Sequence, residues 1–165
     1  MAESRKQIVP YGSWPSPLSA ARVTAGGLRL DQMQLDGEDV YWLEGRASEG
    51  GRNVIVKRSP SGEIADVTPP GFDVRTRVHE YGGGAYAVHH GTVFFSNFAD
   101  QRIYQQDPGG IPQPITPQGG SYADARVDVP RSRLIAVREQ GGQNAIVAVP
   151  GDLLVEGADF YSDPI

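Results

Sequence analysis

The sequence predicts an all-β chain that forms a partial β-propeller of about three four-stranded antiparallel blades. One observation is a turn followed by a short apolar run, which recurs at Val40, Val93 and Leu134 with spacings of 53 and 41 residues. Another is a Thr-Pro pair that recurs at Thr68 and Thr116, 48 residues apart. Repeats of roughly 40–50 residues built from short strands are typical of propeller blades.

Composition and length agree with this fold class. The chain has 165 residues, with 21 glycines and 13 prolines, which indicates many turns between short strands. No long segment has the periodicity of a helix. An antiparallel sandwich or barrel would have a similar density of strands, but the unequal loops and the long period favour blades.

We expect residues 1–27 to form an irregular lead-in that packs through aromatic residues such as Trp14, with one helical turn near Ser19–Val23. The blades are expected near residues 28–70, 78–117 and 121–157, and Phe160–Ile165 resembles the entry to a fourth blade. Turn signals and apolar runs predict four strands in each blade. In the first blade we expect Leu28–Leu35, Val40–Arg46, Asn53–Arg58 and Glu63–Val67, and in the second Gly84–His89, Thr92–Phe98, Arg102–Gln105 and Gln113–Ile115. In the third we expect Ala125–Val129, Leu134–Glu139, Ala145–Val149 and Leu153–Val155. Aromatic residues expected in the core between blades are Trp14, Tyr41, Trp42, Phe94 and Phe95.

Charge and cysteine content narrow the classes of partner. The formal net charge is −5 and there is no basic block, so we expect neither nucleic acid nor an anionic membrane as a partner. The chain has no cysteine, which excludes disulfides, thiolate metal ligands and a cysteine nucleophile. The first ten residues are polar and charged, and no run is long enough to span a bilayer. A cytoplasmic protein without a cofactor is the expectation.

Two glycine motifs superficially resemble catalytic or cofactor sites. Gly119–Ala123 is close to the G-x-S-x-G nucleophile elbow, but the elbow needs a strand before Ser121 and a helix after it. Gly82–Ala87 fits G-x-G-x-x-A, but a dinucleotide site needs a helix after the glycines, and strands are expected there. We therefore predict a turn between blades at the first motif. At the second, we predict close approach of Gly83 and Gly84 to neighbouring backbone at positive φ.

The three histidines are considered as metal ligands. His79 and Glu80 with His89 or His90 would be a minimal set, but the side chains of His89 and His90 are expected to diverge at a strand end. We therefore predict no metal site. Ionisable residues that precede the glycine run are candidates for facing a substrate cavity, although a solvated or salt-bridged loop is the simpler interpretation. These candidates are Arg77, His79, Glu80 and Tyr81.

Three motifs together resemble a known family. Tyr11–Pro17, Arg77–Tyr86 and Tyr122–Asp124, in this order and spacing, resemble the N-terminal part of serine peptidases of the prolyl oligopeptidase family, close to dipeptidyl-aminopeptidase and acylaminoacyl-peptidase-like members. The resemblance implies an N-terminal propeller, commonly of seven blades, that covers a C-terminal α/β-hydrolase domain with a Ser-Asp-His triad. No residue here matches that triad, so no catalytic residue is assigned.

The sequence thus favours a non-catalytic propeller fragment of a serine peptidase. In the full-length enzyme, the blades would gate the access of peptides to the hydrolase domain, and the peptide would be the only substrate partner. The alternative is a stand-alone β-propeller-like binding module that closes by oligomerisation. With either function, we expect the isolated chain to self-associate through its open blade faces and edges. A small hydrolase or metal protein is a third hypothesis, with little support from the motifs. Peptide specificity is not encoded in any motif that we recognise.

Overall fold

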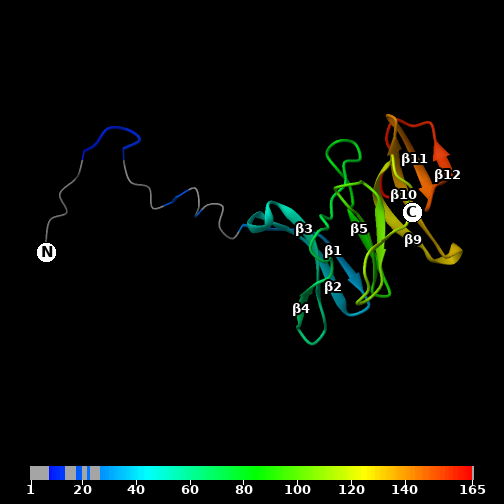
Figure 1. Cartoon of the computed structure of the whole chain (residues 1–165), viewed down its shortest axis with the longest axis horizontal. Coiled ribbons are helices and arrows are strands. Elements are labelled where there is room, and N and C mark those ends of the chain that lie inside the picture. The colour runs from blue at the N-terminus through cyan, green and yellow to red at the C-terminus, as the bar shows by residue number, and fades with distance from the viewer. Residues whose placement is uncertain (1–7, 14–17, 20–21, 23–26, 165) are drawn as a thin grey trace.

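The computed structural model describes residues 8–13, 18–19, 22 and 27–164. Residues 28–156 contain three four-stranded antiparallel sheets that lie side by side (Figure 1). In each sheet, neighbouring strands follow one another in the chain. The first sheet holds β1 (Leu28–Asp36), β2 (Asp39–Arg46), β3 (Arg52–Arg58) and β4 (Ile64–Asp66). The second holds β5 (Tyr86–His89), β6 (Thr92–Ser96), β7 (Ile103–Gln106) and β8 (Gln113–Pro114). The third holds β9 (Ser121–Asp128), β10 (Arg133–Gln140), β11 (Gln143–Ala148) and β12 (Asp152–Glu156), and short 3₁₀ turns lie at Ala47–Glu49 and Val129–Arg131.

The predicted fold class is confirmed, since each sheet is a meander of four strands, as in a propeller blade. The largest error in the strand boundaries is in the third sheet, where β9 begins at Ser121 and not at Ala125. Asp124 has a φ of +53° and interrupts the alternation of the strand, which hides its first half from a search for period-two patterns. Trp14 and most of Ser19–Val23 lie outside the described residues.

The Thr-Pro pair that recurs in the sequence has a structural counterpart. Thr68 Oγ1 accepts a hydrogen bond from the Ile55 N–H at 3.1 Å, and Thr116 Oγ1 accepts one from the Ile103 N–H at 2.9 Å. Both threonines are buried. The equivalence aligns Ile55 of the first sheet with Ile103 of the second.

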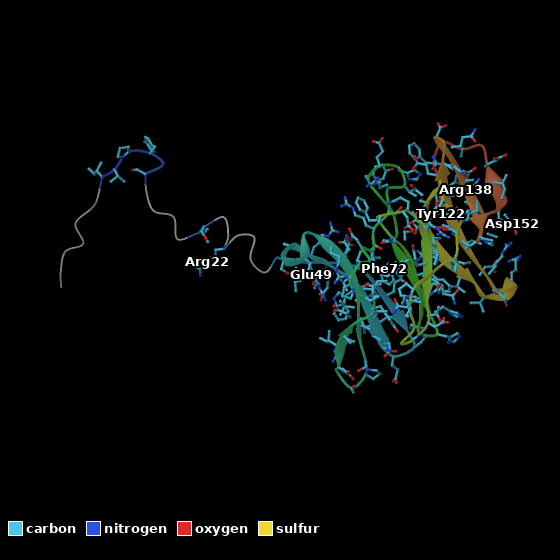
Figure 2. All side chains as sticks on the ribbon, in the orientation of Figure 1. Arg22, Glu49, Phe72, Tyr122, Arg138 and Asp152 are labelled. Atoms are coloured by element: carbon cyan, nitrogen blue, oxygen red, sulfur yellow. The ribbon has the colours of Figure 1, made fainter. Side chains whose placement is uncertain are left out.

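Two apolar clusters hold the sheets together. Between the first and second sheets, Tyr41, Leu43 and Ile55 pack with Tyr86 and Phe95. Between the second and third, the cluster includes Ile103, Tyr122, Leu134, Ala136 and Val147. Figure 2 labels Phe72 and Tyr122, which lie among the sheets rather than at the outer surface. The predicted core positions of Tyr41 and Phe95 are confirmed, while Phe94 is half-buried and Trp42 donates from its indole N–H to Glu44.

Polar side chains of β1 also join the first two sheets. Gln34 Nε2 donates to the Tyr86 carbonyl at 2.8 Å, and the Asp36 carboxylate accepts from the N–H groups of His90 and Gly91. β5 is an edge strand of the second sheet, so some of its backbone groups have no partner strand within that sheet. The bonds from β1 satisfy these groups and those of the turn after β5. The first strand of each sheet therefore lies beside that of its neighbour, and β5 contacts both β1 and β9.

We call the end of the sheets at which β1, β5 and β9 begin the entry end. The loops at this end include residues 47–51, 67–85, 97–102 and 141–142. Residues 157–164 follow β12, form no strand, and place Tyr161 against Val78, Ala123 and Val137. Among the described residues, no helix has the length and apolar character needed to cross a membrane.

Candidate functional site at the entry end

The loop that carries the four candidate residues is a tight, internally bonded turn. Glu80 N–H donates to the Arg77 carbonyl at 2.7 Å, and Gly82 N–H donates to the Val78 carbonyl at 2.9 Å. His79 and Glu80 both have left-handed backbone, with φ of 56° and 64°. Such values are uncommon outside glycine and occur in turns and at functional sites. The buried side chain of Val78 anchors the turn, so its flanking side chains face outward.

His79 fixes the turn to the third sheet. Its backbone N–H donates to Glu139 Oε2 at 2.6 Å, and its Nε2 lies 3.1 Å from Asn144 Oδ1. Because Asn144 Nδ2 donates to the Asp159 carbonyl, its Oδ1 is the acceptor for His79, and Nε2 carries the proton. The His79 ring also makes an edge contact with Phe160, with centroids 4.9 Å apart, and lies 5.9 Å from the Tyr81 ring.

These contacts form one wall of a cleft of about 940 Å³. Its lining residues, from the turn, the β10–β11 hairpin, the end of β12 and the segment after it, include His79, Glu80, Tyr81, Glu139, Asn144, Glu156, Asp159 and Phe160. We call this the acidic cleft. Within the part of the chain that the structure describes, none of its four carboxylates forms a salt bridge. Unpaired carboxylates beside aromatic rings favour a cationic group such as an ammonium.

The structure brings together three of the four candidates and separates the fourth. His79, Glu80 and Tyr81 line the acidic cleft, whereas Arg77 does not. The Arg77 guanidinium lies over the Phe98 ring, 4.3 Å from its centroid. No sequence pattern marked Glu139, Glu156 or Phe160 as part of this site. They lie 60 to 81 residues after His79 in the chain, and only the packing of the third sheet against the turn brings them near.

The glycine motif contacts an aspartate of the third sheet. Gly84 N–H donates to Asp124 Oδ1, and Asp124 N–H donates to the Gly84 carbonyl. A methyl group at Gly84 would lie 2.7 Å from Asp124 Oδ1, and one at Gly83 would lie 3.1 Å from the Ala123 Cβ. The expected close approach is therefore present. The expected positive φ is not, because Gly82, with a φ of +90°, is the only one of the three with left-handed backbone.

Ser121 is the first residue of β9, at the point where the loop after β8 ends. A strand follows it, whereas the nucleophile elbow needs a helix at that position. Gly82–Ala87 likewise leads into β5, so no helix N-terminus is present for a pyrophosphate.

The prediction that the side chains of His89 and His90 diverge is wrong. Their ring centroids are 4.1 Å apart. The φ of His90 is +50°, so the strand alternation that would separate the rings ends at His89. The two rings lie at the opposite end of the second sheet from His79. Among the described residues, no group of three or more His, Asp or Glu side chains has the arrangement of a metal site.

Comparisons with known proteins relate this architecture to peptidases. No protein-family model matches the chain, and no curated protein matches it. Among solved structures, a puromycin-hydrolyzing peptidase of Mycobacterium tuberculosis superposes with a TM-score of 0.82 at 38% sequence identity over 96% of this chain. A puromycin hydrolase superposes with a TM-score of 0.75 at 31% identity over 88% of this chain. A mutant puromycin hydrolase complexed with PGG gives 0.75 at 32% identity over 86%.

The chain spans only 25–28% of the length of these relatives. Their identity to this chain exceeds what fold alone would give, and their class agrees with the motifs at Tyr11–Pro17, Arg77–Tyr86 and Tyr122–Asp124. In fold and in sequence, the chain therefore matches the N-terminal propeller part of a prolyl oligopeptidase family peptidase.

Proposed function

We propose that this chain forms part of the propeller wall of a serine peptidase and controls which peptides reach the catalytic domain. Peptide hydrolysis itself would use a Ser activated by His in that domain, and we assign no catalytic role to Ser121. The cytoplasmic location remains a prediction.

The acidic cleft is the observation that carries the proposal. It lies at the entry end, its carboxylates have no basic partner among the described residues, and Tyr81 is 81% exposed. An ammonium group is attracted to the face of an aromatic ring and to carboxylates. We therefore propose that this cleft receives the amino-terminal end of a peptide.

A binding experiment on the chain tests this role. A short peptide amide with a free amino terminus is titrated by calorimetry, and its N-acetylated form serves as the reference ligand. The double variant Glu80→Gln/Glu156→Gln removes two exposed carboxylates of the cleft, and Glu63→Gln is the matched control in the β3–β4 turn.

We expect the free amine to bind and the acetylated peptide not to bind. The double variant should weaken binding about tenfold, as expected for loss of a charge-assisted hydrogen bond, while Glu63→Gln should not change it. Equal binding of the acetylated peptide, or equal losses in the double variant and the control, would contradict the proposal.

A second candidate function is a binding module that assembles from several copies. It is favoured by the exposed apolar residues of β1, among them Leu30, Met33 and Leu35, and by those of β12, Leu153 and Val155. Blades normally bury such faces against neighbours. The second candidate predicts a stable oligomer of the size of a closed ring, whereas the first predicts only self-association through open blade faces and edges.

A further inference from the structure

At the entry end, the three arginines of β1 and of the loop 67–85 lack an acidic partner. Most other arginines of the sheets form ion pairs: Arg46, for example, contacts Glu44, Glu49 and Asp66. Within the described part of the chain, Arg29, Arg75 and Arg77 have no carboxylate within ion-pair distance. We call these three the arginine cluster.

The cluster is held by the first two sheets. Arg29 Nη2 donates to Asn53 Oδ1 at 3.1 Å. The guanidinium groups of Arg75 and Arg77 lie 4.7 Å and 4.3 Å from the centroid of the same Phe98 ring. Like charges that share one aromatic ring repel each other, and an anion between them would relieve that repulsion.

The backbone beneath the cluster is also fixed. Arg75 N–H donates to the Ser96 carbonyl at 3.0 Å, and Arg77 N–H donates to Gln101 Oε1 at 2.7 Å. Gln101 Nε2 in turn donates to the Phe98 carbonyl at 2.8 Å. These bonds set where the two side chains begin, so little backbone ordering remains when a ligand binds.

A cleft of about 480 Å³ lies beside the cluster and is lined by Arg29 and Arg75. Its one carboxylate is Asp31, so the cleft has an excess of positive charge on a chain whose formal charge is −5. Its walls also include Tyr81, which lines the acidic cleft as well. Two clefts of opposite charge therefore meet at one exposed tyrosine.

We propose that Arg29 and Arg75 of the arginine cluster bind a carboxylate of a short peptide in this cleft, while Arg77, which shares the Phe98 ring with Arg75, adds positive charge beside it. Planar guanidinium groups match a carboxylate through paired N–H donors. The cleft contains Asp31 and apolar wall residues such as Leu43, Val74 and Ala85, which suit a single carboxylate with a side chain better than a polyanion. The orientation of the whole peptide across Tyr81 rests on the proposed function of the acidic cleft, but carboxylate binding does not.

The experiment uses the full chain and acetylated peptides, which lack the ammonium group that the acidic cleft would bind. Acetyl-Gly-Phe with a free carboxylate is titrated into ¹⁵N-labelled chain, and the amide shifts of Thr76 and Gly82, which line the cleft, are followed. Acetyl-Gly-Phe amide, acetyl-Asp-Phe amide and inorganic phosphate are titrated in parallel. Arg75→Gln and Arg29→Gln are compared with Arg58→Gln, an exposed arginine of β3 without an ion pair among the described residues.

We expect saturable shifts with the free carboxylate, no binding of acetyl-Gly-Phe amide, and about tenfold weaker binding in Arg75→Gln and Arg29→Gln. Arg58→Gln should match the unmodified chain. Binding of acetyl-Asp-Phe amide would show that a side-chain carboxylate can occupy the site as well as a terminal one, and it would also support the proposal.

Equal binding of acetyl-Gly-Phe and its amide would overturn the proposal, as would equal losses in Arg58→Gln and Arg75→Gln. Displacement of the peptide by phosphate at equal concentration would show a site that does not recognise peptides. None of these outcomes bears on the acidic cleft, because its test uses peptide amides with free amines.

Discussion

Replacement of Gly84 by alanine should destabilise the chain through its contact with Asp124. The added methyl group would lie 2.7 Å from Asp124 Oδ1, the atom that accepts the hydrogen bond of Gly84 N–H. Asp124 is buried, with 9% of its surface exposed, and its carboxylate cannot swing into solvent without breaking that bond.

The magnitude combines two effects. Overpacking costs about 1–3 kcal/mol, and loss of a hydrogen bond to a charged group costs about 1.5–3 kcal/mol. Partial relaxation should leave a total near 2–4 kcal/mol in the free energy of unfolding. For a chain of this size, that corresponds to a melting temperature lower by roughly 5–15 °C.

Urea unfolding of four variants and their parent tests this reasoning. Gly151→Ala is the matched control, because its backbone is not left-handed and nothing lies within 4 Å of the added methyl group. It should change stability by less than about 1 kcal/mol. Asp124→Ala should cost about 1–3 kcal/mol because the Gly84 N–H loses its acceptor.

In the double variant Gly84→Ala/Asp124→Ala the clash is absent, so its cost should fall at least about 1 kcal/mol below the sum of the single costs. Additive costs, or a Gly84→Ala variant as stable as Gly151→Ala, would refute the role given to this contact.

Three further predictions concern the repeat, the charges and the open faces. Thr68→Val and Thr116→Val should each lower the free energy of unfolding by about 1–3 kcal/mol, because each leaves a buried isoleucine N–H without an acceptor; calorimetric melting checks this, and unequal effects would argue against the structural repeat. The Arg46 guanidinium holds the pKa of the Asp66 carboxyl below its usual 3.8, so its contribution to stability is present above that pH and is lost as the pH falls through the lowered pKa. Asp66→Asn should therefore flatten the loss of stability below pH 4, and an unchanged pH profile would count against the ion pair. Light scattering should show self-association of the chain that Leu30→Lys reduces, because Leu30 is 65% exposed on β1; a monomer at every concentration with one sharp melting transition would exclude open blade faces.

Much of the fold was predictable because each blade repeats a local sequence pattern. Turn residues and short apolar runs located all three sheets, and the recurring Thr-Pro pair corresponds to two matching hydrogen bonds. What was missed depends on backbone that departs from regular alternation. The left-handed residues Asp124 and His90 concealed the start of β9 and brought two histidine rings together.

The site was less predictable than the fold. The run of ionisable residues before the glycines pointed to His79, Glu80 and Tyr81, which do share a cleft. Its other wall comes from residues near Glu139 and Phe160, and no local pattern links them to the turn. Arg77 lies outside the acidic cleft because its guanidinium packs over the ring of Phe98.

The most direct test of the central claim is the turnover of peptide reporters by the purified chain. Aminoacyl, acyl-aminoacyl and prolyl reporters are each incubated with the chain and with Ser121→Ala, and released product is measured over time. If the chain is a propeller wall without catalytic groups, neither protein should release product faster than buffer alone does. Turnover by the unmodified chain that Ser121→Ala abolishes would contradict the account, because it would place a nucleophile within these three sheets.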